Sequence, residues 1–130
     1  MFTYRYLVMT YQLVNLYKVR PTELFLCKES LEYFAHTEIS PEPIEILIDE
    51  DGEQFLSDGH NRAVAELKKG RPLQPANVHT VQETNCYGLA AYILPEAQKC
   101  LRCGIRTLRD LEGRVLATRA EVKQKSEDIN

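Results

Sequence analysis

Long hydrophobic runs, internal repeats and low-complexity segments are all missing from this sequence. No stretch of its 130 residues approaches the roughly 18 consecutive apolar residues of a membrane-spanning helix. The apolar start, residues 2–14, is broken by polar side chains and lacks both a charged leader and a small-residue cleavage site, so we expect no signal peptide. The protein is therefore expected to be cytoplasmic and to have no membrane partner, while its 44% hydrophobic content excludes wholesale disorder.

A strong excess of either charge is also lacking. The formal net charge is −3, whereas proteins that coat nucleic acids are usually strongly basic. The charges are nevertheless unevenly distributed, because residues 21–60 carry eleven acidic side chains and one basic one, and residues 61–119 carry ten basic and five acidic ones. The sign changes near residues 58–62. Two interpretations stay open: a chance mixture of solvated faces, or a cationic wall that holds an anionic ligand.

Paired cysteine motifs are scarce. Of four cysteines only Cys100 and Cys103 form a CxxC pair, and neither the other two cysteines nor the three histidines have paired spacing. A zinc site needs four ligands, commonly from two such pairs. Since nothing suggests secretion, a disulfide framework is not expected either. We interpret Cys100 and Cys103 as two small buried thiols one helical turn apart and expect no metal site, with metal or redox use as the alternative.

Short alternating and helical patterns are present instead. Residues 28–36 repeat apolar side chains at helical spacing, and residues 44–48 alternate before an acidic turn and a second apolar run, which predicts a β-hairpin. A helix after that hairpin should stop at Gly70, and residues 76–81 predict another strand. Residues 88–94 and 95–103 predict two helices, because Pro95 is poorly tolerated inside one helix but can open a new one.

The fold class expected from these patterns is α+β, with a small mixed β-sheet and short helices in a single domain over residues 1–130. The junction between the hairpin and the following helix contains the residue types of an anion site. A strand that turns into a helix at Gly59 exposes the first helical N–H groups, which favour phosphate, and the guanidinium of Arg62 can clamp phosphate oxygens. His60 is a candidate proton carrier or phosphate contact, and Asp58 a candidate helix cap, magnesium ligand or general base. The alternative is an ordinary capped surface helix.

The residues around this junction resemble the ParB/sulfiredoxin-like superfamily. The resemblance rests on VRPTEL from residue 19, PIEI from residue 43 and FLSDGHNRAVAELKKG from residue 55. A proline after a short strand, a strand pair and an Asp-Gly-His-x-Arg box opening a helix follow that superfamily's order of features. The resemblance covers about residues 17–82, with residues 88–125 as a helical C-terminal part. It implies a ParB/sulfiredoxin-like fold and a nucleotide site formed by Gly59, His60, Asn61 and Arg62.

The branches of that superfamily differ in their chemistry. Sulfiredoxins carry a cysteine just after the glycine of the box, where this chain has His60, so sulfinic-acid repair is not expected. Chromosome-partitioning ParB proteins have an Arg-rich box and a helix-turn-helix domain, which this chain lacks. The archaeal free-serine kinase branch is the most similar, with an Asp-Gly-His-His-Arg box in which Asn61 replaces the second histidine. That branch also has a glutamate two residues after the early proline, implicated as a base for the substrate hydroxyl, and Glu23 occupies that place.

The leading prediction is a nucleotide-binding domain that acts as a phosphotransferase, like a small-molecule kinase, or as a nucleotide hydrolase. Its cofactor would be ATP, ADP or CTP with Mg²⁺, its second partner a small hydroxyl substrate, and its catalytic residues Glu23, Asp58 and His60. One alternative is a DNA-binding accessory or nuclease-like module, motivated by the superfamily and by the four arginines between residues 102 and 114. Another is a nucleotide-responsive interaction domain without catalysis.

Overall fold

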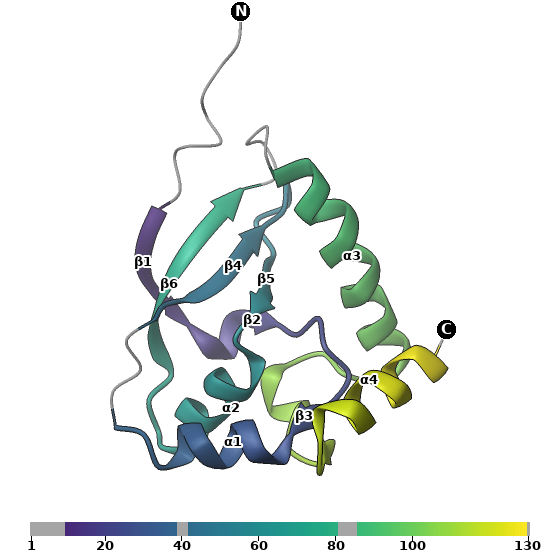
Figure 1. Ribbon diagram of the computed structural model, residues 1–130. Helices are drawn as coiled ribbons and strands as arrows, with labels where there is room; N and C mark the ends of the chain where they lie inside the picture. The colour runs from purple at the N-terminus through teal and green to yellow at the C-terminus, as the bar shows by residue number, and fades with distance from the viewer. Residues whose placement is uncertain (1–9, 39–41, 81–85, 130) are drawn as a thin grey trace, which may run out of the picture.

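The computed structural model describes residues 10–38, 42–80 and 86–129. The protein consists of a five-stranded mixed sheet with helices packed around it (Figure 1). The sheet has the strand order β1-β6-β4-β5-β2, and two further strands, β3 and β7, pair separately. The elements in chain order are β1 (Thr10–Asn15), the 3-10 turn η2 (Leu16–Lys18), β2 (Val19–Arg20), β3 (Leu26–Cys27), α1 (Lys28–Ala35), β4 (Ile44–Ile48), β5 (Gln54–Asp58), α2 (His60–Lys68), β6 (Leu73–Thr80), α3 (Cys86–Arg102), η3 (Leu108–Leu111), β7 (Val115–Leu116) and α4 (Arg119–Asp128). The expected α+β class is confirmed.

The β4–β5 hairpin is the centre of the sheet. β5 is antiparallel to β4, and the short β2 runs parallel to β5, so that the chain segment after β2 begins beside the strand that leads into α2. On the other side of β4, β6 is parallel and β1 is antiparallel to β6. This pairing brings residues 20–27 next to the β5–α2 junction, although about 35 residues of chain separate them, and that proximity builds the site described below.

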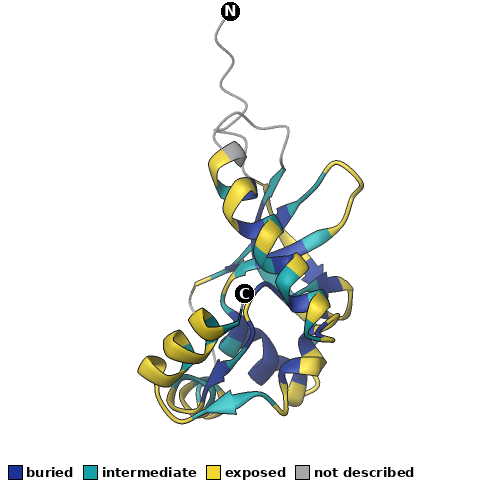
Figure 2. Ribbon diagram, turned by 90° about the vertical axis from the view of Figure 1, so that its right-hand side faces the viewer, coloured by how far each residue is buried: buried dark blue, intermediate teal, exposed yellow. Residues whose placement is uncertain are grey.

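Alternation along β4 divides the apolar side chains between two cores. Ile44 and Ile46 join the main core with residues of α2, β6 and the C-terminal segment, whereas Leu47 faces the opposite side and packs with Phe55 against α3. The buried residues therefore lie between the sheet and the helices, and the outward faces of the helices are exposed (Figure 2).

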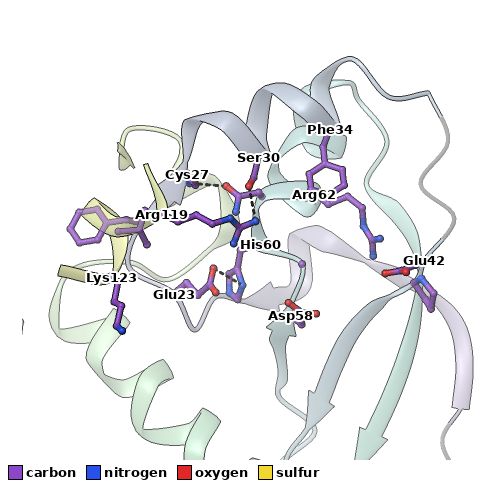
Figure 3. A pocket seen from close by; sticks show the side chains of 15 residues that line it. Glu23, Cys27, Ser30, Phe34, Glu42, Asp58, His60, Arg62, Arg119 and Lys123 are labelled. Carbon is purple, nitrogen blue, oxygen red and sulfur yellow. Dashed lines mark hydrogen bonds and ion pairs between the residues drawn. The ribbon is translucent and has the colours of Figure 1, made fainter. Parts of the chain in front are cut away.

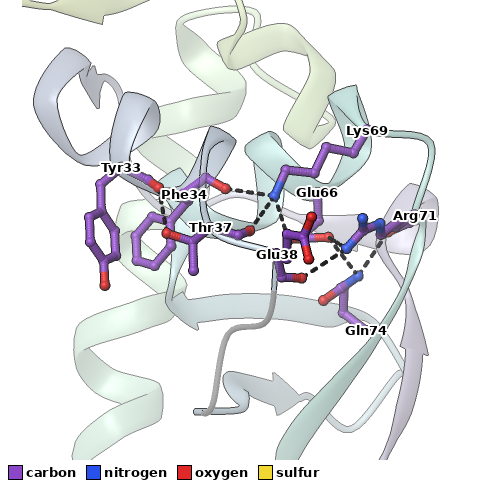
Figure 4. Close-up of polar contacts among 8 residues, drawn as sticks. All are labelled: Tyr33, Phe34, Thr37, Glu38, Glu66, Lys69, Arg71 and Gln74. Carbon is purple, nitrogen blue, oxygen red and sulfur yellow. Dashed lines mark hydrogen bonds and ion pairs between the residues drawn. The ribbon is translucent and has the colours of Figure 1, made fainter.

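The α1 helix is fixed to α2 by a polar network around Lys69 (Figure 4). The Lys69 ammonium donates to the carbonyl oxygens of Phe34 and Thr37, both at 2.7 Å, and lies 3.3 Å from an oxygen of the buried Glu66 carboxylate. Arg71 lies 3.8 Å from the other Glu66 oxygen and donates to the Glu38 carbonyl. The unsatisfied carbonyls at the end of α1 thus receive donors from the end of α2.

Most of the predicted elements are confirmed, and one prediction is wrong. Helix α1, the hairpin and the stop at Gly70, which has a φ of +77°, are present as expected. Residues 88–94 and 95–103, however, belong to one continuous helix, α3, which contains Pro95 in its interior. Pro95 is exposed, so its ring lies on the solvent side of the helix. Ile93 and Ala97, on the opposite side, are buried against Leu47 and Phe55, and this packing keeps the helix continuous.

No helix within the described ranges combines the length and the apolar character needed to cross a membrane.

Candidate functional site

A cavity of about 330 Å³ opens where the starts of α1, α2 and α4 approach the segment that follows β2 (Figure 3). All of the predicted site residues line it, namely Glu23, Asp58, Gly59, His60, Asn61 and Arg62. The segment before β4 adds Glu42, and α1 adds Ser30 and Phe34. The cavity lies at the low end of the size range of small-ligand pockets.

Gly59 forms the sharp transition from β5 to α2. Its φ of +104° lies in the left-handed region, and a Cβ at this position would come within 2.9 Å of Cγ2 of Ile44. Gly59 is the N-cap of α2, no side chain caps the helix, and its first turn contains no acidic residue. Asp58 therefore does not serve as the helix cap, which was one of its three predicted roles. The start of α2 meets the cavity without a carboxylate of its own.

The His60 side chain is completely buried, with 0% of its surface exposed. Its Nε2 accepts a hydrogen bond of 2.9 Å from the backbone N–H of Thr22, so in the neutral ring the proton is on Nδ1. The Thr22 hydroxyl in turn donates to the carbonyl of Leu56 at 2.6 Å. Burial lowers the pKa of His60 to about 3, although nearby Asp58 acts in the opposite direction. A ring that stays neutral and buried favours a positioning role for His60 over the predicted proton carrier.

The Nδ1 atom of His60 points to Glu23, whose Oε1 lies 3.3 Å away. Half of the Glu23 side chain is exposed, but desolvation of its carboxyl group, helped by the charge of Asp58, raises the pKa to about 7, and Arg119 partly offsets this effect. A carboxyl group with a pKa near 7 matches the requirement for a general base at neutral pH. Glu23 therefore lies next to His60 of the box, and both line the same cavity.

The backbone around Glu23 is held by the C-terminal part of the chain. The buried Cys100 thiol lies 3.5 Å from the Glu23 carbonyl oxygen, and burial raises the pKa of Cys100 to about 12. The Arg114 Nε donates to the Leu24 carbonyl at 2.7 Å, and its guanidinium stacks 4.5 Å from the ring centroid of Phe25. Cys100 is thus a buried thiol that contacts the site segment. Cys103 is partly exposed.

Asn61 and Arg62 complete the junction in different ways. The Oδ1 of Asn61 accepts a 2.9 Å hydrogen bond from the backbone N–H of Cys27, which fastens the start of α1 to the start of α2. Arg62 is only 8% exposed, and desolvation lowers the pKa of its guanidinium while carboxylates, Asp58 and Glu42 first among them, act to raise it. In Figure 3 the Arg62 guanidinium extends toward Glu42. Asn61 therefore binds the scaffold, and Arg62 brings a buried cation to the cavity.

Sequence reasoning missed a contribution from α4. Arg119 and Lys123 line the cavity, and the Nη2 of Arg119 donates to the Ser30 hydroxyl at 2.9 Å. Both cations lie outside the segment that carries the resemblance, and no spacing in the sequence connects them with residues 58–62. A Thr118-x-x-Glu121 pattern begins α4, and the Glu121 N–H donates to the Thr118 hydroxyl. This pattern predicts where the helix starts, but not that the helix lies beside the cavity.

A preformed metal centre is not found within the described residues, where no group of three His, Cys, Asp or Glu side chains is arranged to hold an ion. The cavity carboxylates Glu42 and Asp58 nevertheless fit the way Mg²⁺ is usually bound, which is by one or two carboxylates together with the phosphates of a ligand.

Comparison with known proteins gives a likeness of fold. No protein-family model matches the chain, and no curated protein is similar to it. Among solved structures, the crystal structure of protein Atu1540 from Agrobacterium tumefaciens is similar, with a TM-score of 0.50 and 13% sequence identity over 65% of this chain. The chain spans about half of that protein, 48% of its length.

Proposed function

We propose that the cavity binds the phosphate groups of a nucleotide and that the protein transfers a phosphoryl group to a small hydroxyl substrate or to water. One observation carries the proposal: the uncapped start of α2, the buried Arg62 guanidinium and the Glu23 carboxyl, whose pKa is about 7, line a single cavity. Phosphoryl transfer needs positioning and charge neutralisation more than covalent chemistry, and these groups supply both.

The phosphate side of this site would be the β5–α2 junction. Exposed N–H groups at a helix start bind phosphate, and the glycine at position 59 leaves room for its close approach. The guanidinium of Arg62 can form two parallel hydrogen bonds with phosphate oxygens. Asp58 and Glu42 are the residues that would hold Mg²⁺, which when bound neutralises phosphate charge.

The acceptor side would be Glu23. Its carboxylate accepts the proton of the attacking hydroxyl while the oxygen forms a bond to phosphorus and the bond from phosphorus to the leaving phosphate oxygen breaks. The Nδ1–H of His60 is buried and makes no hydrogen bond in the described residues, but it lies 3.3 Å from the Glu23 carboxylate and would donate to that group when it is ionised. His60 is then a positioning residue, and Glu23 is the group that takes the proton.

The resemblance of residues 17–82 to the ParB/sulfiredoxin-like superfamily supports this proposal, because that superfamily binds nucleotides, with a box that differs between its branches. We therefore also propose membership of that superfamily. The presence of Glu23 beside His60 agrees with the arrangement that the free-serine kinase branch implies.

Isothermal titration with ATP, ADP and CTP in the presence of Mg²⁺ tests the nucleotide site. The wild type should bind at least one of them, and Arg62→Ala should weaken binding at least tenfold. Because Arg62 is buried, Arg62→Lys provides a variant that keeps the charge, and thermal unfolding of each variant separates lost binding from lost folding. Lys125→Ala, in α4 but outside the cavity lining, is the matched control. No heat with any nucleotide would contradict the proposal.

A DNA-associated role is the second candidate, and one observation favours it: Arg102, Arg106 and Arg109 are exposed on the C-terminal part of the chain. Phosphate contacts of this kind give binding that weakens steeply with salt. A gel shift at low and at moderate salt tests it, and the absence of a shift at low salt would exclude it.

A further inference from the structure

The first two turns of α4 bring a second pair of cations to the cavity. Arg119 and Lys123 are four residues apart, which puts them on the same face of α4, and both line the cavity that Arg62 also lines. In Figure 3 they approach from the side of α4, while Arg62 lies beyond His60 on the side of Phe34 and Glu42. The cavity thus has basic side chains on two opposite walls.

The two α4 cations of the cavity lack the carboxylate partner that some other cations of the chain have. Lys28, Lys69 and Lys99 each lie within ion-pair distance of a glutamate. Within the described part of the chain, Arg119 and Lys123 have no such carboxylate, and the hydrogen bond of the Arg119 guanidinium goes to a neutral hydroxyl, that of Ser30. Arg119 acts on Glu23 only at longer range, by lowering its pKa. An anion in the cavity would give both cations the partner that the protein does not provide.

Packing does not explain why α4 lies over the cavity. None of the side chains of α4 is buried, and its overall composition is strongly polar. The helix is joined to the rest of the protein by Ile129, which packs against the main core, and by the hydrogen bond from Arg119 to Ser30, while the Thr118 hydroxyl caps its first turn. What α4 presents to the cavity is mainly positive charge. A helix that buries so little and brings two cations to a ligand-sized cavity is suited to contact the ligand itself.

We propose that Arg119 and Lys123 form a second phosphate subsite opposite Arg62, so that the cavity selects ligands with at least two linked phosphoryl groups over monophosphates. This inference rests on the proposed function, because it assigns the second phosphate of the ligand bound there. On binding, the Arg119 guanidinium exchanges the Ser30 hydroxyl for phosphate oxygens, a charge-assisted interaction roughly twice as strong as a neutral hydrogen bond. The terminal phosphoryl group then lies between the two walls, beside Glu23.

The test compares phosphate with pyrophosphate, and AMP with ADP, by isothermal titration in the presence of Mg²⁺. The wild type should bind ADP at least tenfold more tightly than AMP, and pyrophosphate more tightly than phosphate. In Arg119→Ala/Lys123→Ala these ratios should fall below about threefold, while AMP affinity changes less than twofold. Arg62→Lys should weaken AMP and ADP alike. Lys125→Ala, on the same helix, should keep the wild-type ratios. Because Arg119 is exposed, its replacement should not impair folding of the double variant, and thermal unfolding checks this.

The outcomes separate this inference from the proposed function. If nucleotides bind and the double variant keeps the wild-type ADP-to-AMP ratio, the second subsite is wrong and the nucleotide site stands. If nucleotides do not bind but pyrophosphate binds more tightly than phosphate in a manner that requires Arg119, the nucleotide proposal fails and the subsite stands. If neither nucleotides nor pyrophosphate bind, both are overturned.

Discussion

The Nδ1 atom of His60 lies 3.3 Å from Oε1 of Glu23, while the other ring nitrogen, Nε2, accepts the backbone N–H of Thr22. A ring that accepts at Nε2 carries its proton at Nδ1, on the side of Glu23, although Nδ1 makes no hydrogen bond within the described residues. The carboxyl group therefore lies beside a neutral ring instead of an imidazolium. The pKa of Glu23 is raised to about 7, mainly by desolvation and further by the charge of Asp58, while Arg119 lowers it.

Glu23→Gln is expected to abolish phosphoryl transfer and to spare nucleotide binding. Removing a general base lowers kcat by roughly 10²–10⁴-fold, whereas Gln retains the size of the side chain and leaves Arg62 and the start of α2 in place. Nucleotide affinity measured by titration should stay within about threefold of the wild type. Turnover equal to that of the wild type would show that Glu23 is not the base, and an absence of turnover in the wild type would favour a binding domain without catalysis.

The raised pKa of Glu23 also predicts how rate and stability depend on pH. Because the ionised form accepts the proton, wild-type kcat should rise with pH through about 7. Stability should change in the opposite direction: the folded state favours the protonated carboxyl, so the free energy of unfolding falls as pH rises from 4.5, the ordinary pKa, to about 7. Glu23→Gln should remove this loss of stability between pH 4.5 and about 7. Urea unfolding of both proteins at pH 5 and pH 7.5 measures the difference.

His60→Gln should make the protein less sensitive to acid. Burial holds the pKa of His60 near 3 in the folded state against about 6.5 when unfolded, so the unfolded state binds an extra proton as pH falls below 6.5. The wild type should therefore lose roughly 1 kcal/mol of stability per pH unit relative to His60→Gln between pH 6 and pH 4. Gln keeps an acceptor for the Thr22 N–H. Parallel unfolding curves for the two proteins at each pH would contradict a buried neutral ring.

The sequence alone predicts the helices and strands that depend on local patterns of apolar and turn residues. The alternation of Ile44, Ile46 and Ile48 and the acidic turn before Phe55 predict the hairpin, since a strand with one face in each core requires that period. The continuity of α3 through Pro95 was not predictable locally. It depends on Ile93 and Ala97 packing against strands 40 residues away, which outweighs the lost hydrogen bond.

The part of the site that a single chain segment forms could be predicted from the sequence. Gly59 and Arg62 are three residues apart in sequence, and the resemblance added Glu23, which lies beside His60. The hydrogen bond of His60 is to Thr22, in the segment after β2, and the position of Arg119 depends on where α4 packs. Contacts of that kind are decided by tertiary packing, for which a single sequence carries no local signal.

Gly59→Ala should impair both stability and binding, and Gly52→Ala is its control. Both glycines have positive φ, +104° and +83°, which costs alanine about 1 kcal/mol. A Cβ at Gly52 meets nothing within 4 Å, whereas one at Gly59 would come within 2.9 Å of Ile44 Cγ2. We expect a loss of about 1 kcal/mol for Gly52→Ala and roughly 2–4 kcal/mol for Gly59→Ala. Equal losses in thermal unfolding would show that Ile44 yields freely.

Asn61→Asp should separate binding from folding. Asp keeps the oxygen that accepts the Cys27 N–H, and a negative charge in the first turn of α2 is favourable for the helix, so stability should match the wild type. The same charge repels phosphate, and nucleotide affinity should fall at least tenfold. Asn61→Ala, which removes the acceptor, should instead lose roughly 1–2 kcal/mol of stability. Unchanged nucleotide affinity in Asn61→Asp would argue that the anion lies away from this junction.

Lys69→Met should loosen the wall of the cavity that α1 forms, although Lys69 itself is not part of the lining. The ammonium satisfies the Phe34 and Thr37 carbonyls and faces the buried Glu66, so its removal should cost roughly 2–3 kcal/mol of stability. Lys68→Met, one position earlier on the exposed side of α2, should cost less than about 0.5 kcal/mol. Because Phe34 lines the cavity and its carbonyl is one of the two acceptors, hydrogen exchange at the end of α1 should accelerate in Lys69→Met and not in Lys68→Met. Equal exchange in both variants would mean that packing between α1 and α2, and not this ammonium, holds the wall in place.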